Sequence, residues 1–362
     1  MAESGVWPDR RVIDLLGFEL PILQAPMAGA QGSDLTIAVS EAGGLGALPC
    51  AMLSPEQIRK EIAAIRAATS RPFVLNFFCH RSPEPSVERE EAWRARLKPY
   101  YEELGIDQSA IPAGASRRPF DAAACDLVEE LRPSVVSFHF GLPEESLLDR
   151  VRSTGAKILA SATTVAEARW LDARGCDLVI AQGAEAGGHR GTFLAADVAT
   201  QVGTMALVPQ VVDAVSVPVV AAGGIADGRG IAAALALGAS AVLIGTAYLR
   251  CPEARISDVH RRALEEISDD GTAITNVFSG RPARGIVNRL VREVGPVSEV
   301  APEFPLAGMA IAPLRAASEA KGSPDFAQMW AGQAVPLGRA MPAGDLTRRL
   351  ADETHHKLRF LT

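Results

Sequence analysis

Residues Pro218–Thr246 read PVVAAGGIADGRGIAAALALGASAVLIGT: an apolar run, a glycine-rich loop, a helix of small residues and a second apolar run. Both runs are continuously apolar instead of alternating, which is typical of parallel strands buried on both faces. Gly238 stands between the helix and the second run, where glycine commonly ends a helix. The stretch therefore predicts one strand–helix–strand unit of a parallel sheet.

The same pattern continues toward the N-terminus. Short apolar runs lie at Ile22–Gln24, Gly46–Leu48, Phe73–Asn76, Val135–Phe138, Lys157–Ala160, Leu178–Ala181, Pro218–Ala221 and Ala241–Ile244. Helix-like sequence separates them, as at Val165–Ala173 and Gly230–Leu237 and after Ser54-Pro55, a helix-start signal. Eight such strands are the number in a closed (β/α)8 TIM barrel, whereas an open doubly wound sheet usually has fewer at this length. We expect an α/β protein with a TIM barrel.

Two segments interrupt this alternation and predict the domain organisation. Residues 80–118 are charged and proline-rich, and we expect a helical insertion there. Residues 253–334 lose the strand signal and contain helix-like runs, which indicates a smaller, mainly helical cap domain inserted after the eighth strand. The last helix, Asp345–Leu358, returns to the barrel. The barrel domain then comprises residues 1–252 and 335–362.

The composition excludes several classes of protein. With 362 residues, 48% hydrophobic and 22% charged, the chain has enough apolar surface to fold as a globule. A net charge of −7 argues against a nucleic-acid binder. The uncharged stretch Ile231–Leu249 approaches the length of a membrane span, but glycines interrupt it, so we expect no membrane segment. Five scattered cysteines without a CxxC pair indicate buried, reduced thiols in a cytoplasmic protein.

Active sites of TIM barrels lie at the carboxyl ends of the strands, and unusual residues gather there. Gly223 and Gly224 follow the seventh run, and Gly245-Thr246 follows the eighth. Glycine-rich loops that open onto helices expose backbone N–H groups, which can surround a phosphate. Ordinary turns between strand and helix are the alternative reading of these glycines.

Histidines supply the candidate acid–base chemistry. His189 lies among four glycines and two alanines after the sixth run, so its imidazole faces open space and can accept a proton near neutral pH. His139 either lines the site or serves as a hydrogen-bonded support, and His80 is a weaker candidate. We expect His260, His355 and His356 to be solvated. The histidines share no metal-ligand spacing, so no metal site is expected.

Two amides end otherwise apolar strands. Asn76 and Gln182 would cost free energy if buried without a hydrogen-bond partner. The edge of a flavin ring offers suitable donors and acceptors. The backbone of a neighbouring loop could satisfy the amides equally well.

Six motifs in this order resemble the nitronate monooxygenase family, formerly called 2-nitropropane dioxygenases, in its class I type. They are QAPMAG (24–29), AVSEAGGLG (38–46), LNFF (75–78), HFG (139–141), AQGAEAGGHRG (181–191) and AAGGIADGRG (221–230). The resemblance covers residues 20 to about 250 by motif, and the cap and C-terminus by length and order.

The resemblance implies a barrel that binds FMN non-covalently, with His189 as the catalytic residue. His139 and Met27 would contact substrate. The implied cofactor contacts are Ala25, Pro26, Met27, Asn76, Gln182, Gly187, Gly188, Gly223, Gly224, Leu243, Ile244, Gly245 and Thr246. Many relatives carry a Gln-Met pair where this chain has Leu243-Ile244. Because phosphate turns act largely through backbone N–H groups, we expect FMN binding to survive that difference.

The implied reaction is oxidation of an alkyl nitronate by O2 to a carbonyl compound and nitrite through a flavin semiquinone, with propionate 3-nitronate as a candidate substrate. His189 would deprotonate a neutral nitroalkane and orient a nitronate. Three alternatives remain: an FMN-dependent NAD(P)H:quinone reductase, an enoyl-acyl-carrier-protein reductase, and a non-catalytic FMN-binding module. The partners would be small molecules and O2, without nucleic acid or membrane, and a homodimer is compatible with the sequence.

Overall fold

A computed structural model describes residues 7–111, 117–194 and 197–359. Eight parallel strands pair in the order β1-β9-β8-β6-β5-β4-β3-β2. A parallel bridge from Leu23 to Leu45, next to β2, brings the two ends of this sheet together and closes the barrel. The strands are β1 Ile22–Gln24, β2 Gly46–Pro49, β3 Phe73–Phe78, β4 Val135–His139, β5 Lys157–Ala162, β6 Leu178–Gln182, β8 Val219–Ala222 and β9 Ala241–Ile244. The predicted TIM barrel and its eight strands are confirmed.

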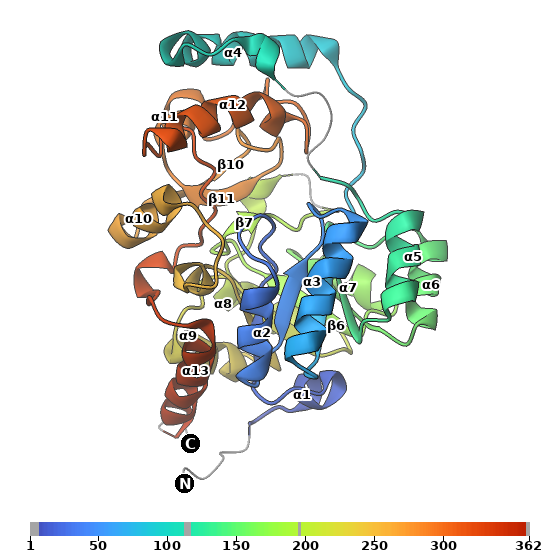
Figure 1. Cartoon of the computed structure of the whole chain (residues 1–362). Helices are drawn as coiled ribbons and strands as arrows, with labels where there is room; N and C mark the ends of the chain where they lie inside the picture. Colours follow the sequence, from blue (N-terminus) through green and yellow to red (C-terminus); the bar gives the residue numbers. More distant parts are fainter. Residues whose placement is uncertain (1–6, 112–116, 195–196, 360–362) are drawn as a thin grey trace.

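Helices surround the barrel (Figure 1). The predicted start at Ser54 is a capping box, in which the Ser54 side chain and the Gln57 side chain each bond the other residue's backbone N–H. The helix after β8 begins at Gly228, earlier than predicted, because Asp227 accepts hydrogen bonds from the first backbone N–H groups. The surrounding helices are α1 Arg11–Leu16, α2 Ser33–Glu41, α3 Pro55–Ala68, α5 Ala122–Leu131, α6 Glu145–Ser153, α7 Val165–Asp172, α8 Thr204–Val212, α9 Gly228–Ala236 and α13 Ala343–Leu358.

The last helix, α13, occupies the place predicted for it. It packs against α9 and α2, and its apolar side chains Leu346 and Leu350 are fully buried in the barrel's outer layer. Tyr248 joins the helix to the barrel, since its hydroxyl lies 2.8 Å from Thr347 Oγ1 in a buried hydrogen bond. Among the described residues, no helix is both long enough and apolar enough to cross a membrane.

A cap covers the carboxyl ends of the strands (Figure 1). It contains α10 Asp258–Glu266, α11 Arg289–Val294 and α12 Ala307–Ala320. The insertion predicted at 80–118 forms α4, Val87–Leu104, although residues 112–116 of it lie outside the described residues. Helix α4 lies on α12, and the two share a hydrophobic core that includes Trp93 and Leu314. We propose to group α4 with the cap.

Residues 253–334, in which the sequence shows no strand signal, contain two short strands beside their helices. Strands β10, Thr272–Thr275, and β11, Ala283–Ile286, form an antiparallel sheet with β7, Gly188–His189. The two cap strands are short and mixed in polarity, and β11 pairs with a segment about a hundred residues earlier. No local sequence pattern therefore predicts these strands. The loop that carries His189 is therefore one strand of the cap's sheet.

Candidate active site

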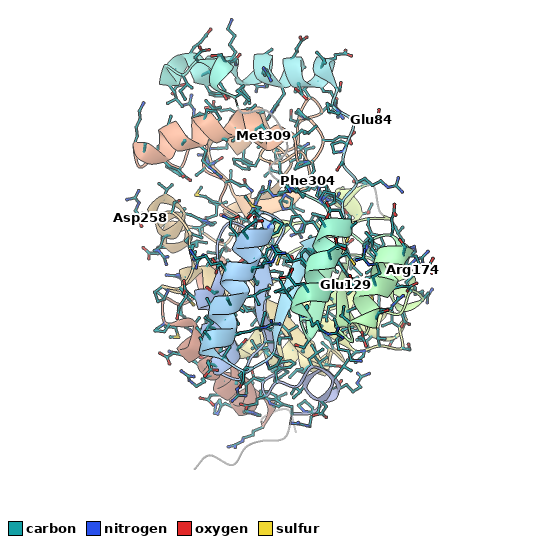
Figure 2. All side chains as sticks on the ribbon, turned by 45° about the vertical axis from the view of Figure 1, so that its right-hand side comes forward. Glu84, Glu129, Arg174, Asp258, Phe304 and Met309 are labelled. Atoms are coloured by element: carbon teal, nitrogen blue, oxygen red, sulfur yellow. The ribbon has the colours of Figure 1, made fainter. Side chains whose placement is uncertain are left out.

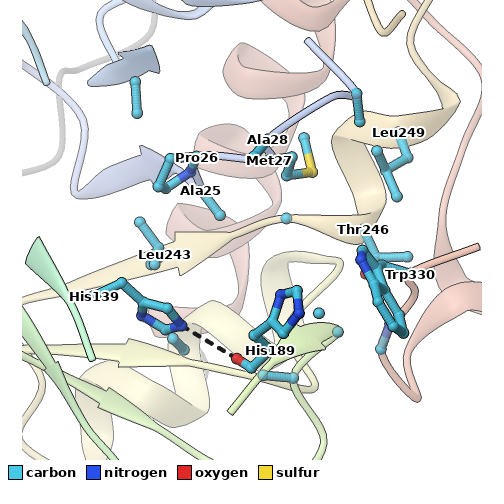
Figure 3. Close-up of a pocket in the computed structure, with 18 of the residues that line it drawn as sticks. Ala25, Pro26, Met27, Ala28, His139, His189, Leu243, Thr246, Leu249 and Trp330 are labelled. Atoms are coloured by element: carbon cyan, nitrogen blue, oxygen red, sulfur yellow. Dashed lines mark hydrogen bonds between the residues drawn. The ribbon is translucent and has the colours of Figure 1, made fainter. Parts of the chain in front are cut away.

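A cavity of about 410 Å³ lies where the barrel strands end, beneath the cap (Figure 3). Except for Ile244, every side chain or glycine predicted to contact cofactor or substrate lines it. Ile244 is 1% exposed and belongs to the barrel core, because successive side chains of a strand point to opposite faces and Leu243 takes the cavity side. The sequence motifs thus converge on one enclosed space.

Arg190 shapes the loop that carries His189. Its guanidinium is fully buried and donates hydrogen bonds to loop carbonyls, at 3.2 Å to Gly183 O and 2.9 Å to Gly188 O. The same loop has no room at Gly187, where a Cβ atom would come within 2.6 Å of Gly332 N. A glycine-rich loop is thereby held by the buried Arg190 cation and by the close approach of the backbone at Gly332.

The backbone and ring of His189 are both held. Its carbonyl accepts from Gln182 Nε2 at 3.1 Å and lies 3.3 Å from His139 Nε2 (Figure 3). The other end of the Gln182 amide accepts from Gly191 N at 2.7 Å. On the cap side, His189 Nε2 lies 2.9 Å from the hydroxyl oxygen of Ser279.

His139 and Asn76 each have partners inside the protein. Because His139 Nε2 faces a carbonyl it carries the proton, so its Nδ1 accepts from the Ser161 hydroxyl at 3.1 Å. The Asn76 amide donates to Ser137 Oγ at 2.8 Å. His139 Nε2 thus supports the His189 loop, and its Nδ1 is held by Ser161 on the neighbouring strand β5, while the ring still borders the cavity.

The electrostatics keep the site's histidines neutral. Burial, followed by the charge of Arg117, lowers the pKa of His189 well below its usual range. Burial also lowers the pKa of His139 to about 3. Arg117 lines the same cavity and is 7% exposed, and burial lowers its pKa to about 10, so it remains a cation at neutral pH. A neutral imidazole and a buried cation in one cavity suit a reaction that starts from or passes through an anion.

The glycines after β8 and β9 meet the requirements of a phosphate site. Gly223 has φ +114°, and a Cβ there would lie 2.9 Å from Ala186 N. Within the described part of the chain, the N–H groups of Gly223, Gly224 and Gly245 have no internal acceptor. Thr246 Oγ1 accepts from Gly332 N at 2.9 Å, which fastens the returning chain beside these groups. Free N–H groups converging on a tight glycine cradle fit the phosphate of a cofactor.

Several residues at the site escaped sequence reasoning. Arg117, Ser279 and Trp330 come from segments without a recognisable motif, and Trp330 lies at the cavity with its ring 5.3 Å from that of His189 (Figure 3). No local signal could have found them, because they reach the site through the tertiary packing of the cap.

The histidines expected to be solvated behave differently from one another. His260 was expected on a solvated helix face, but it is 7% exposed and lines the cavity, because the strongly amphipathic α10 turns it inward. His356 is exposed as expected, and His355 is half-buried in a stack on Trp7. His80 is buried, with its ring 4.8 Å from that of Phe304, which Figure 2 shows between the cap helices and the barrel.

Acidification is expected to destabilise the fold through these histidines. Burial lowers the pKa of His260 to about 4 and of His139 to about 3, whereas an unfolded histidine titrates near 6.5. The unfolded chain therefore binds more protons below about pH 6.5, and the free energy of unfolding falls by about 1.4 kcal/mol per pH unit and group toward pH 4. Urea unfolding at several pH values should show a shallower acid slope for His260→Gln; an unchanged slope contradicts the burial of a neutral His260.

The fold and cavity define a class: TIM barrels with a glycine cradle after the last two barrel strands and a neutral histidine in the same cavity. Comparison with known proteins narrows this class. The model of the nitronate monooxygenase family matches residues 9–353. A nitronate monooxygenase of Pseudomonas aeruginosa is 42% identical over 349 residues, which cover 95% of this chain and 98% of that protein.

Solved structures of similar proteins point to the same family. A nitroalkane oxidase from Streptomyces ansochromogenes superposes with a TM-score of 0.88 at 39% identity, covering 97% of this chain and all of that one. FabK from Thermotoga maritima has a TM-score of 0.74 at 29% identity, with 97% of each chain covered. The chain belongs to the nitronate monooxygenase family, a family of flavin-dependent oxidoreductases.

Proposed function

We propose that this chain binds FMN in the cavity and oxidises alkyl nitronates with O2 to a carbonyl compound and nitrite. One observation supports the proposal most strongly: the N–H groups of Gly223, Gly224 and Gly245, which have no acceptor among the described residues, share a cavity with the neutral imidazole of His189. The glycine N–H groups can bind a phosphate, and the imidazole can accept a proton from a substrate with an acidic α-carbon.

FMN is the flavin that this cavity favours. The glycine cradle is a single phosphate site, and FMN has one phosphate. Beyond the cradle, Met27, Asn76 and Gln182 would border the ribityl chain and the ring, together with the backbone of Gly187. When bound, the flavin accepts electrons from the substrate and passes them to O2.

The protein's own groups would bind and orient the substrate. When a neutral nitroalkane enters, His189 accepts the α-proton, and the electron pair of the C–H bond remains on the nitronate. When a nitronate enters, no proton needs to leave, and the positive charge of Arg117 stabilises the anion. The rings of Phe78 and Trp330 lie 6.4 and 5.3 Å from that of His189, so apolar surface borders the imidazole in the cavity.

Two assays test this proposal: identification of the flavin that the purified protein releases, and identification of the products formed from ethylnitronate. The purified protein should be yellow and release FMN on denaturation, and aerobic incubation with ethylnitronate should yield nitrite and consume O2. NADPH-dependent reduction of a quinone or an enoyl thioester without nitrite would instead favour a reductase on the same barrel. Bound flavin with turnover of none of these compounds would indicate a binding module.

We further propose that the enzyme works in the cytoplasm. All five cysteines are free thiols, and Cys50, Cys125, Cys176 and Cys251 are buried. Burial raises the pKa of the Cys176 and Cys251 thiols to about 12, so they stay protonated and unreactive. Unpaired cysteines are typical of a reducing compartment.

A further inference from the structure

Ser279 reaches the proposed catalytic histidine from the cap. It lies in the turn between β10 and β11, is fully buried, and does not border the cavity. The His189 Nε2–Ser279 Oγ distance of 2.9 Å is the only hydrogen bond that the ring of His189 makes within the described residues. Because Ser279 contacts the imidazole of His189 but does not border the cavity, it can affect the reaction only through that imidazole.

The neighbours of Ser279 favour one direction for this hydrogen bond. A hydroxyl has one proton to donate, and Ser279 Oγ faces the carbonyl of Arg281 at 3.3 Å. The turn that holds this geometry is closed by the Asn276 carbonyl, which accepts from Gly280 N at 2.7 Å. Gly280 has φ +85°, and a Cβ there would lie 2.0 Å from Pro302 O, so the turn has little freedom to move.

When the Ser279 hydroxyl donates its hydrogen bond to the Arg281 carbonyl, its oxygen accepts a hydrogen bond from His189 Nε2–H. The neutral ring then has its proton on Nε2 and its lone pair on Nδ1. Nδ1 makes no hydrogen bond within the described residues, and it is not a fully buried atom. It is therefore open toward the cavity that His189 lines.

We propose that Ser279 is a positioning residue that holds His189 in the Nε2–H tautomer, so that Nδ1 is the atom that accepts the substrate's α-proton. The proposal rests on the proposed function. In that step the substrate C–H bond breaks, an Nδ1–H bond forms, and the electron pair stays on the nitronate. The imidazolium keeps its Nε2–H bond to Ser279 throughout. The opposite tautomer would turn an N–H toward the substrate and could accept nothing.

Kinetics of Ser279→Ala test the role. We expect kcat/KM for nitroethane to fall about 10- to 100-fold, because the tautomer is no longer held, and kcat/KM for ethylnitronate to fall less than about 3-fold. Ser279→Thr keeps the hydroxyl and should recover most of the loss. The matched control is Ser318→Ala, which removes an equally buried cap hydroxyl that bonds Ser323 O. Equal losses on both substrates, or failure of threonine to rescue, overturn the positioning role.

A second measurement does not depend on activity. In protein labelled with 15N-histidine, the His189 ring, assigned by its absence in His189→Asn, should show a protonated Nε2 and an unprotonated Nδ1. Ser279→Ala should shift both resonances toward the averaged values of exchanging tautomers. A protonated Nδ1 in the unmodified protein overturns the inference whether or not nitronates are turned over. The expected spectrum without nitronate turnover would instead count against the proposed function alone.

Discussion

Replacing His189 by asparagine lowers turnover of neutral nitroalkanes by about 10²- to 10⁴-fold and leaves the flavin bound. This range is what a positioned acid–base group typically contributes, and asparagine cannot accept the α-proton. Activity on preformed nitronates should fall much less, because that substrate arrives already deprotonated. Steady-state kinetics on nitroethane and ethylnitronate measure the difference, and the flavin absorbance of the purified variant reports on cofactor binding.

His355→Asn is the control for this substitution. His355 stacks on Trp7 at the outer end of α13, away from the cavity, so its loss should leave both activities unchanged. Equal losses on the two substrates in His189→Asn would count against a role as base. Loss of flavin from that variant would show that the imidazole supports the cofactor instead.

Gly223→Ala weakens flavin binding so strongly that the protein is purified without its yellow colour. The glycine has φ +114°, where L-residues are strained, and the added Cβ would lie 2.8 Å from Thr204 Oγ1 and 2.9 Å from Ala186 N. Relieving these contacts moves the loop whose N–H groups would hold the phosphate. We expect the dissociation constant for FMN, measured by flavin fluorescence titration of the apoprotein, to rise at least about 100-fold, equivalent to about 2.7 kcal/mol.

Gly105→Ala separates this effect from backbone strain alone. Gly105 ends α4 with φ +68°, and a Cβ there meets nothing within 4 Å. That variant should lose about 1 kcal/mol of stability and bind FMN normally. Tight FMN binding by Gly223→Ala would place the phosphate elsewhere.

The sequence predicted the barrel well because its signals are local. Runs such as Val219–Ala222 are continuously apolar, as is typical of parallel strands buried on both faces, and glycine or a capping residue follows them. The site residues after these strands were predicted for the same reason, since the fold brings strand ends together whatever the loops do. Gly223, Gly245 and His189 share one cavity on that basis.

The cap's sheet and the site residues that the cap contributes could not be predicted, because they depend on contacts between distant segments of the chain. Strand β11 has no apolar alternation, and its partner β7 precedes it by about a hundred residues, so the cap's sheet could not be read locally. Ser279 lies in an ordinary turn and matters only because that sheet brings it to His189. For His260, charged neighbours on α10 suggested a solvated face, whereas packing buries that position.

Anaerobic mixing of the purified, flavin-loaded protein with ethylnitronate and, separately, with NADPH tests the central claim most directly. If the cavity holds FMN with His189 and Arg117 arranged for a nitronate, ethylnitronate should change the visible flavin spectrum rapidly, and NADPH should leave it almost unchanged. Protein that stays colourless after reconstitution with FMN, or a flavin that NADPH bleaches and ethylnitronate does not, would contradict the account.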